Sequence, residues 1–181
     1  MSNLKLTSFL GIEFGTSKEI SKEKLLLREG AIFDEENSSE DVLFFDGLKF
    51  GGRQTTYVFL LFVDNKFAKS SVVITPKLDA FAMDLYKEIK NEINSKYYQT
   101  KDDFEIFEEP YYENDGYTET GIRVGKISVS SYWKFADQYG GQDDFISVRI
   151  TEDMQIIINY EDGDLSDEMV DKKNRENSDD Y

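Results

Sequence analysis

The side chains that could do chemistry in this chain are carboxylates, because its 181 residues include 37 Asp and Glu but no His and no Cys. The lack of His and Cys excludes a Ser-His-Asp or Cys-His catalytic set and a His/Cys zinc site. Glycosidases and two-metal phosphoesterases need only carboxylates, so these classes stay open. Pairs of acids are trivial to find among 37, however. We therefore expect no enzyme activity and no catalytic residue, cofactor or metal.

Two kinds of motif resemble ligand-binding loops but fail on spacing. In the segment Gly11–Lys18, Lys does not directly follow the second glycine, as a phosphate-binding loop requires. Asp162–Asp167 has oxygen ligands at alternate positions, but it lacks the Gly and Glu of a calcium loop. Glu113–Gly116 has the Gly, yet its twelfth position is Ile122. Only weak, adventitious calcium or magnesium binding stays open.

The acidic residues concentrate in three windows, 31–48, 101–120 and 161–181. Together these windows carry a net charge of −19, against −16 for the whole chain. Phosphate groups and anionic membranes repel such a surface, so we expect no nucleic acid and no membrane as partners. A basic protein surface is the expected partner. The alternative is that the acidic windows are solvated loops that keep the protein soluble.

One acidic window also carries aromatic residues, which makes it the best candidate interaction site. Tyrosines supply contact area and carboxylates attract a basic partner. The candidates in this window are Glu105, Glu108, Glu109, Tyr111, Tyr112, Glu113, Asp115 and Tyr117, and the first window adds Asp34, Glu35 and Glu36. The alternative is that Phe104 and Phe107 pack into the core and the tyrosines only cover it.

The first half of the chain predicts two helices around a β-meander. Thr16 and Glu19 have the spacing of a capping box, which predicts a helix from there to about Arg28. Apolar and β-branched runs then predict strands at 42–45, 48–50, 55–63 and 66–74. A second helix is expected over 78–97, because apolar residues recur every four positions there, at Phe81, Leu85, Ile89, Ile93 and Tyr97.

The second half predicts a long acidic loop followed by more strands. The loop covers 100–120, with a strand around 105–107 as an alternative, and strands follow at 121–129, 130–135, 145–150 and 154–160. The fold class is therefore α+β, an antiparallel sheet with two helices on one face. We expect one domain over 1–160, in two sub-parts (1–99 and 121–160) if the loop divides it. An acidic tail follows over 161–181, in which Ser166 could cap a short helix.

A resemblance to known proteins covers roughly residues 9–97. The segment Phe9–Glu19, the helix ending at Gly30, Gly51-Gly52 and the Asp64–Lys66 turn look like β-lactamase-inhibitor-protein-like small bacterial domains and uncharacterised Bacteroides-type proteins. The resemblance implies helices on an antiparallel sheet and a binding or inhibitory role. It rests on glycines and apolar positions, so no functional residue is carried over from those families.

The combined expectation is a non-enzymatic acidic module that docks on a basic protein surface, of the inhibitor, immunity or antagonist type. A secreted or envelope-associated structural domain is the alternative, and a carboxylate or divalent-metal enzyme is the second alternative. No apolar run approaches the ~18 residues of a membrane span. The start, Met1–Lys5, lacks the apolar stretch of a signal peptide, which favours the cytoplasm. A secreted or periplasmic location is the alternative if a signal was removed.

Overall fold

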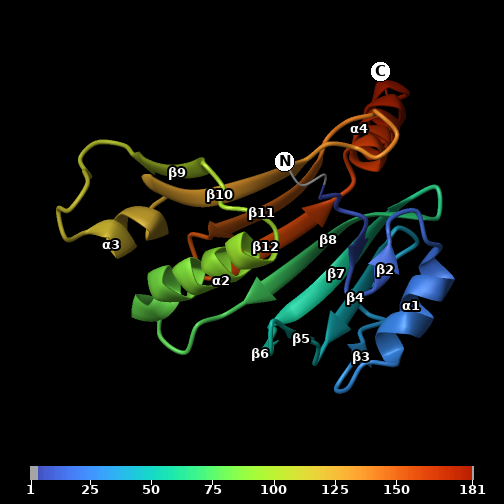
Figure 1. The fold of residues 1–181 in the computed structure, drawn as a ribbon, viewed down its shortest axis with the longest axis horizontal. Coiled ribbons are helices and arrows are strands. Elements are labelled where there is room, and N and C mark those ends of the chain that lie inside the picture. Colours follow the sequence, from blue (N-terminus) through green and yellow to red (C-terminus); the bar gives the residue numbers. More distant parts are fainter. Residues whose placement is uncertain (1–3, 181) are drawn as a thin grey trace.

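The computed structural model describes residues 4–180, which form an eight-stranded antiparallel sheet with helices (Figure 1). The strand order is β3-β4-β7-β8-β12-β11-β10-β9. These strands are β3 (Ile32–Phe33), β4 (Val42–Asp46), β7 (Tyr57–Val63), β8 (Lys66–Ile74), β9 (Asp102–Phe107), β10 (Ile127–Phe135), β11 (Asp144–Ile150) and β12 (Ile156–Glu161). The expected α+β class with an antiparallel sheet is confirmed.

Helices and short hairpins complete the structure. The helices are α1 (Lys18–Leu26), the 3-10 turn η1 (Asp79–Phe81), α2 (Ala82–Lys96), α3 (Thr118–Arg123) and α4 (Gly163–Ser178). Two two-stranded sheets pair β1 (Ser8–Phe9) with β2 (Ile12–Glu13) and β5 (Lys49–Phe50) with β6 (Arg53–Gln54).

One face of the main sheet carries the core. Alternate residues of the central strands are fully buried, as the two-residue period of a strand predicts; they include Leu60, Val72, Val148 and Ile158. Leu25 of α1 and Ile89 and Ile93 of α2 belong to the same buried cluster. Both helices therefore pack on this face, where Figure 1 shows α2 (green) lying over β11 and β12 and α1 (blue) beside β4.

The opposite face of the sheet is more open. Phe44, Tyr57 and Phe59 form a half-buried aromatic row there, with the Phe44 ring centroid 4.9 Å from that of Tyr57 and 6.1 Å from that of Phe59. Farther along, the Ser71 hydroxyl donates to the Asn159 side chain at 2.5 Å. This face is therefore partly apolar and partly polar.

Several expected elements begin or end elsewhere in the structure. The cap of α1 is Ser17, whose Oγ accepts from the Ile20 N–H at 3.3 Å, while the Thr16 hydroxyl bonds back to the Glu13 carbonyl. In the second helix, the expected apolar repeat of four residues began at Phe81, but that side chain is half exposed. The actual helical period is 3.6 residues, and it buries Ala82 and Tyr86. The expected strand over 121–129 is wrong, because α3 ends at Arg123 and β10 begins only at Ile127.

The expected loop and tail are both more ordered than the sequence indicated. Residues 100–120 contain β9 and the start of α3, and residues 163–178 form α4. Asp162, not Ser166, caps α4, and its carboxylate accepts from the Leu165 N–H at 2.8 Å. Asp164 in the first turn and Arg175 in the last turn have the charges that stabilise a helix dipole at its two ends. Near the β7–β8 hairpin, Lys172 of α4 binds Asp64 at 3.1 Å.

Replacing Ile158 with Ala is expected to lower the free energy of unfolding by about 2–5 kcal/mol, because this side chain is wholly buried under the helices. Ile157→Ala is the matched control, since Ile157 lies on the opposite face and is only half-buried; it should cost about 1 kcal/mol. Urea denaturation measures both. Equal losses would contradict the assignment of one covered and one open face.

Candidate functional site

The strand β9, which carries the main acidic window, forms one edge of the sheet. Within residues 4–180 it pairs only with β10, from Phe107 opposite Ile127 to Asp102 opposite Tyr132. The Glu108 N–H continues this pairing by donating to the Lys126 carbonyl at 2.9 Å. Hydrogen bonding alternates along an antiparallel strand, so the backbone groups of 103, 105 and 107 point away from β10. The site therefore includes a free strand edge.

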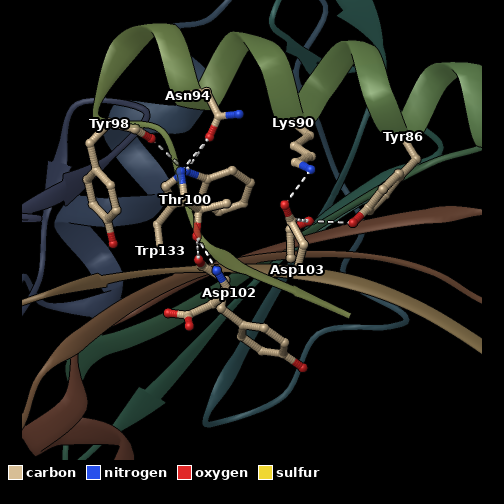
Figure 2. A network of polar contacts seen from close by, with 10 residues as sticks. Tyr86, Lys90, Asn94, Tyr98, Thr100, Asp102, Asp103 and Trp133 are labelled. Atoms are coloured by element: carbon tan, nitrogen blue, oxygen red, sulfur yellow. Dashed lines mark hydrogen bonds and ion pairs between the residues drawn. The ribbon is translucent and has the colours of Figure 1, made fainter. Parts of the chain in front are cut away.

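A polar network from α2 fixes this edge in place (Figure 2). The Asp103 carboxylate accepts from Lys90 Nζ at 2.7 Å and from Ser131 Oγ at 2.5 Å. Ser131 also shares a hydrogen bond with the Tyr86 hydroxyl. Farther along the helix, Asn94 Oδ1 accepts from Trp133 Nε1 at 3.0 Å and from the Thr100 N–H at 3.1 Å. The edge strand is thus attached through side chains as well as through its backbone.

The network includes serine, lysine and tyrosine, but its arrangement is structural. Ser131 is wholly buried, so no substrate can reach its hydroxyl. Burial raises the pKa of Tyr86 to about 12, which keeps its phenol protonated at neutral pH. The sequence analysis missed these residues, although the four-residue spacing of Tyr86, Lys90 and Asn94 puts them on one side of a helix.

Two of the predicted site residues meet at a cavity beside the edge, which we call the acidic hollow. Glu105 and Glu113 line this cavity of about 340 Å³, and neither makes an ion pair with a side chain of residues 4–180. Its apolar lining consists of Ala80, Met83, Phe107, Ile122 and Met154. Asp79 and Glu119 also line it, but both are held by Arg123, and Lys87 contributes one cation.

Four other predicted residues gather at a second cavity, the tyrosine hollow. It measures about 400 Å³ and is lined by Tyr111, Tyr112, Asp115 and Tyr117 together with Pro110 and Thr120. The Asp115 carboxylate accepts from the N–H of Tyr112 at 3.0 Å and of Tyr117 at 2.7 Å, which orders the turn. Tyr112 and Tyr117 remain exposed, so their rings are available for contact.

The remaining predicted residues lie outside these hollows. Glu108 pairs with Lys126 at 3.0 Å, and Glu109 is exposed. Asp34, Glu35 and Glu36 follow β3, at the other edge of the sheet. With about 4.8 Å between neighbouring strands, the two edges lie roughly 34 Å apart. The structure therefore does not bring the two acidic windows together as one site.

The alternative prediction, that Phe104 and Phe107 pack into the core, is correct for Phe107 only. Phe107 is partly buried and packs against the core. Phe104 is 44% exposed on the open face, where its ring lies 5.8 Å from that of Tyr132. Strand alternation separates the two rings in this way, because they are three positions apart and so lie on opposite faces.

A further acidic group that the sequence analysis missed lies near the start of α4. Asp137, Asp144, Asp162 and Asp164 line a cavity of about 500 Å³ together with Glu13. Asp144 is only 4% exposed, and its Oδ1 accepts from the Gly163 N–H at 2.9 Å. Burial raises the pKa of Asp144 to about 6, with the neighbouring aspartates adding to the rise. Within residues 4–180, no three Asp or Glu side chains are arranged to hold a metal ion.

Asn94→Ala is expected to cost about 1–3 kcal/mol of stability, because the Trp133 and Thr100 N–H groups lose a buried acceptor. Trp133 is the only tryptophan, so its fluorescence reports the change directly. Asn91→Ala, on the exposed side of the same helix, is the control and should stay within about 0.5 kcal/mol of the wild type. An unchanged fluorescence spectrum and stability in the Asn94 variant would contradict the network.

Asp144→Asn is expected to stabilise the protein at pH 8 but not at pH 4. The folded pKa of about 6 exceeds the ordinary value of 3.8, so folding favours the protonated carboxyl. The corresponding stability is fully present below about pH 3.8 and is lost as the pH rises through 6. Asparagine keeps the acceptor for Gly163 and removes the charge, so the gain at pH 8 should be about 1–3 kcal/mol. Urea denaturation across this pH range measures it, and a pH-independent difference would refute the assignment.

Comparisons with known proteins found no similar protein or family. No protein-family model matches the chain, and searches of curated proteins and of solved structures found no match. The resemblance over residues 9–97 therefore stays a prediction. Among the helices of residues 4–180, none is long and apolar enough to cross a membrane.

Proposed function

We propose that this protein is a non-enzymatic binding module that docks on a basic protein surface through β9 and the segment 108–117, as an inhibitor, immunity protein or antagonist would. The observation that carries the proposal is the acidic hollow. There, the unpaired carboxylates of Glu105 and Glu113 flank an apolar floor next to a free strand edge. Such a hollow suits a long basic side chain.

The chemistry of a lysine or arginine matches this hollow in two parts. Its aliphatic stem can lie on Met83, Phe107 and Ile122, while its charged head reaches Glu105 and Glu113. Charge-assisted hydrogen bonds to carboxylates are the stronger kind, which favours this pairing. The exposed rings of the tyrosine hollow would add contact area around it.

The free edge offers a second mode of contact. An extended partner segment can add to an exposed strand through main-chain hydrogen bonds, with its side chains giving specificity. Acidic side chains on β9 would select a basic segment and repel an acidic one, including a second copy of this chain. Charges on an edge strand also prevent aggregation. That role alone would suit the alternative, a structural domain whose acid only keeps it soluble.

The test uses a defined basic peptide, ten residues of alternating Lys and Val, with a Glu-Val peptide of equal length as its control. We expect the Lys-Val peptide to bind at low salt and to weaken strongly toward physiological ionic strength, because exposed charges are then screened beyond about 8 Å. Glu105→Gln with Glu113→Gln should weaken binding about tenfold. Calorimetry measures the affinity, and amide NMR shifts locate the peptide.

The matched control is Glu35→Gln with Glu36→Gln, which removes the same charge at the opposite edge. It should change the affinity by less than twofold. Equal weakening by the two double variants would mean that only net charge attracts the peptide. That result, or no binding at low salt, would contradict the proposed docking site and favour the solubilising role.

A further inference from the structure

A separate cavity with an aromatic lining lies on the helix-covered face of the sheet. It measures about 420 Å³ and lies between α2, the β1–β2 turn and β5. Its aromatic lining is Phe9, Phe50, Tyr97 and Tyr160, with Ile89 and Ile93 from α2. The Tyr160 ring centroid lies 5.3 Å from that of Phe9 and 6.0 Å from that of Phe50. Cavities of this size hold small molecules, and this one shares no residue with the acidic hollow.

Two unpaired cations stand at this cavity, although the protein as a whole is strongly acidic. Arg28 follows α1 and Lys96 ends α2, and neither forms an ion pair with a carboxylate of residues 4–180. Glu92 also lines the cavity, but Arg53 binds both of its oxygens, at 2.6 and 2.8 Å. The charge left over at the cavity is therefore positive.

Tyr160 supplies a polar group without a protein partner. This residue is 5% exposed, and its hydroxyl makes no hydrogen bond with any residue from 4 to 180 in the structure. Burial raises its pKa, so the phenol keeps its proton and can donate. Because the residue lines the cavity and its hydroxyl oxygen is itself accessible, this group can donate to a bound molecule.

The turn at the lip of the cavity is conformationally strained. Leu10 has a φ of 46° and is followed by Gly11 at 77°. Glycine adopts this left-handed region freely, whereas a leucine there is unusual and costs about 1–3 kcal/mol. Both residues line the cavity. They are the two central residues of the turn that joins Phe9 to its partner Ile12, and a two-residue hairpin turn of this kind requires a positive φ at both positions. The turn therefore fixes the shape of the lip.

We propose that this cavity binds a small molecule with a flat aromatic body and one anionic group. The body would pack against Phe9, Phe50 and Tyr97, and the anion would meet Arg28 and Lys96. Tyr160 would donate a hydrogen bond to it. A neutral apolar ligand would leave the cations and the hydroxyl unused, and a cationic one would be repelled. This inference does not depend on the proposed docking function.

The test compares two fluorescent probes with nearly the same aromatic body. One, 1-anilinonaphthalene-8-sulfonate, carries an anionic group, and the other, N-phenyl-1-naphthylamine, lacks it. We expect the anionic probe to bind the folded protein at one site, at least fivefold more tightly than the neutral probe. Arg28→Gln with Lys96→Gln should weaken the anionic probe about tenfold and leave the neutral probe within twofold. Fluorescence titration measures all four affinities.

Three matched variants separate the cavity from other causes. Lys24→Gln with Lys101→Gln removes the same charge at exposed positions outside the cavity and should change binding by less than twofold. Tyr160→Phe should weaken the anionic probe three- to tenfold, and circular dichroism checks that it still folds. Glu105→Gln with Glu113→Gln should leave probe binding unchanged, so that failure of one proposal is distinguishable from failure of the other.

Three results would overturn the inference. The first is no preference for the anionic probe. The second is equal weakening by the cavity and control charge variants. The third is NMR shifts that place the probe on the open face, at Phe44, Tyr57 and Phe59, and not at Phe9, Ile93 and Tyr97. Each result would mean that the cavity is a packing feature of the junction between α2, the β1–β2 turn and β5.

Discussion

The pairing of β8 with β12 joins the two halves of the chain, and the arrangement of the sites depends on it. Six residue pairs connect the strands, from Ile74 opposite Ile156 to Lys69 opposite Glu161. This junction makes one sheet out of two runs of strands and puts β3 and β9 at its outer edges. It also carries Tyr160 under α2, where this residue lines the aromatic cavity. The distance between the two acidic edges thus follows from a pairing at the centre of the sheet.

Sequence reasoning found the elements whose periodicity is local. The alternation of Ile146, Val148 and Ile150 matches their burial in β11, and the second helix lies where its apolar repeat placed it. It missed helices in segments whose highly charged composition leaves no clear apolar repeat. In α4 the acids and bases mask a helix that lacks a strong apolar stripe, and only the cap at Asp162 and the ordering of charges reveal it. Residues 118–123 form a helix within the connection that brings the chain back to pair β10 with β9, and no apolar repeat in the sequence marks it.

The candidate site was predictable in kind but not in geometry. Exposed acids next to tyrosines could be read directly from residues 105–117, yet nothing in the sequence shows that Glu105 and Glu113 share one hollow. The hollow that they share is completed by α3 and by the N-terminal end of α2, and these segments lie close together only in the folded protein. The aromatic cavity was harder still to predict, because its residues come from five separate segments and most of them are ordinary core positions.

Helix α2 connects the two proposed sites, and this limits how their variants can be interpreted. Lys90 and Asn94 hold the β9 edge, whereas Ile89, Ile93 and Lys96 line the aromatic cavity. A substitution that loosens the helix would therefore weaken binding at both places without contacting either ligand. The Gln variants avoid this, because they remove charge from exposed side chains and leave the buried helix contacts intact. Asn94→Ala is the reference for a loosened helix, since Asn94 accepts directly from Trp133 Nε1. A real effect at one site must leave that fluorescence, and the other site, unchanged.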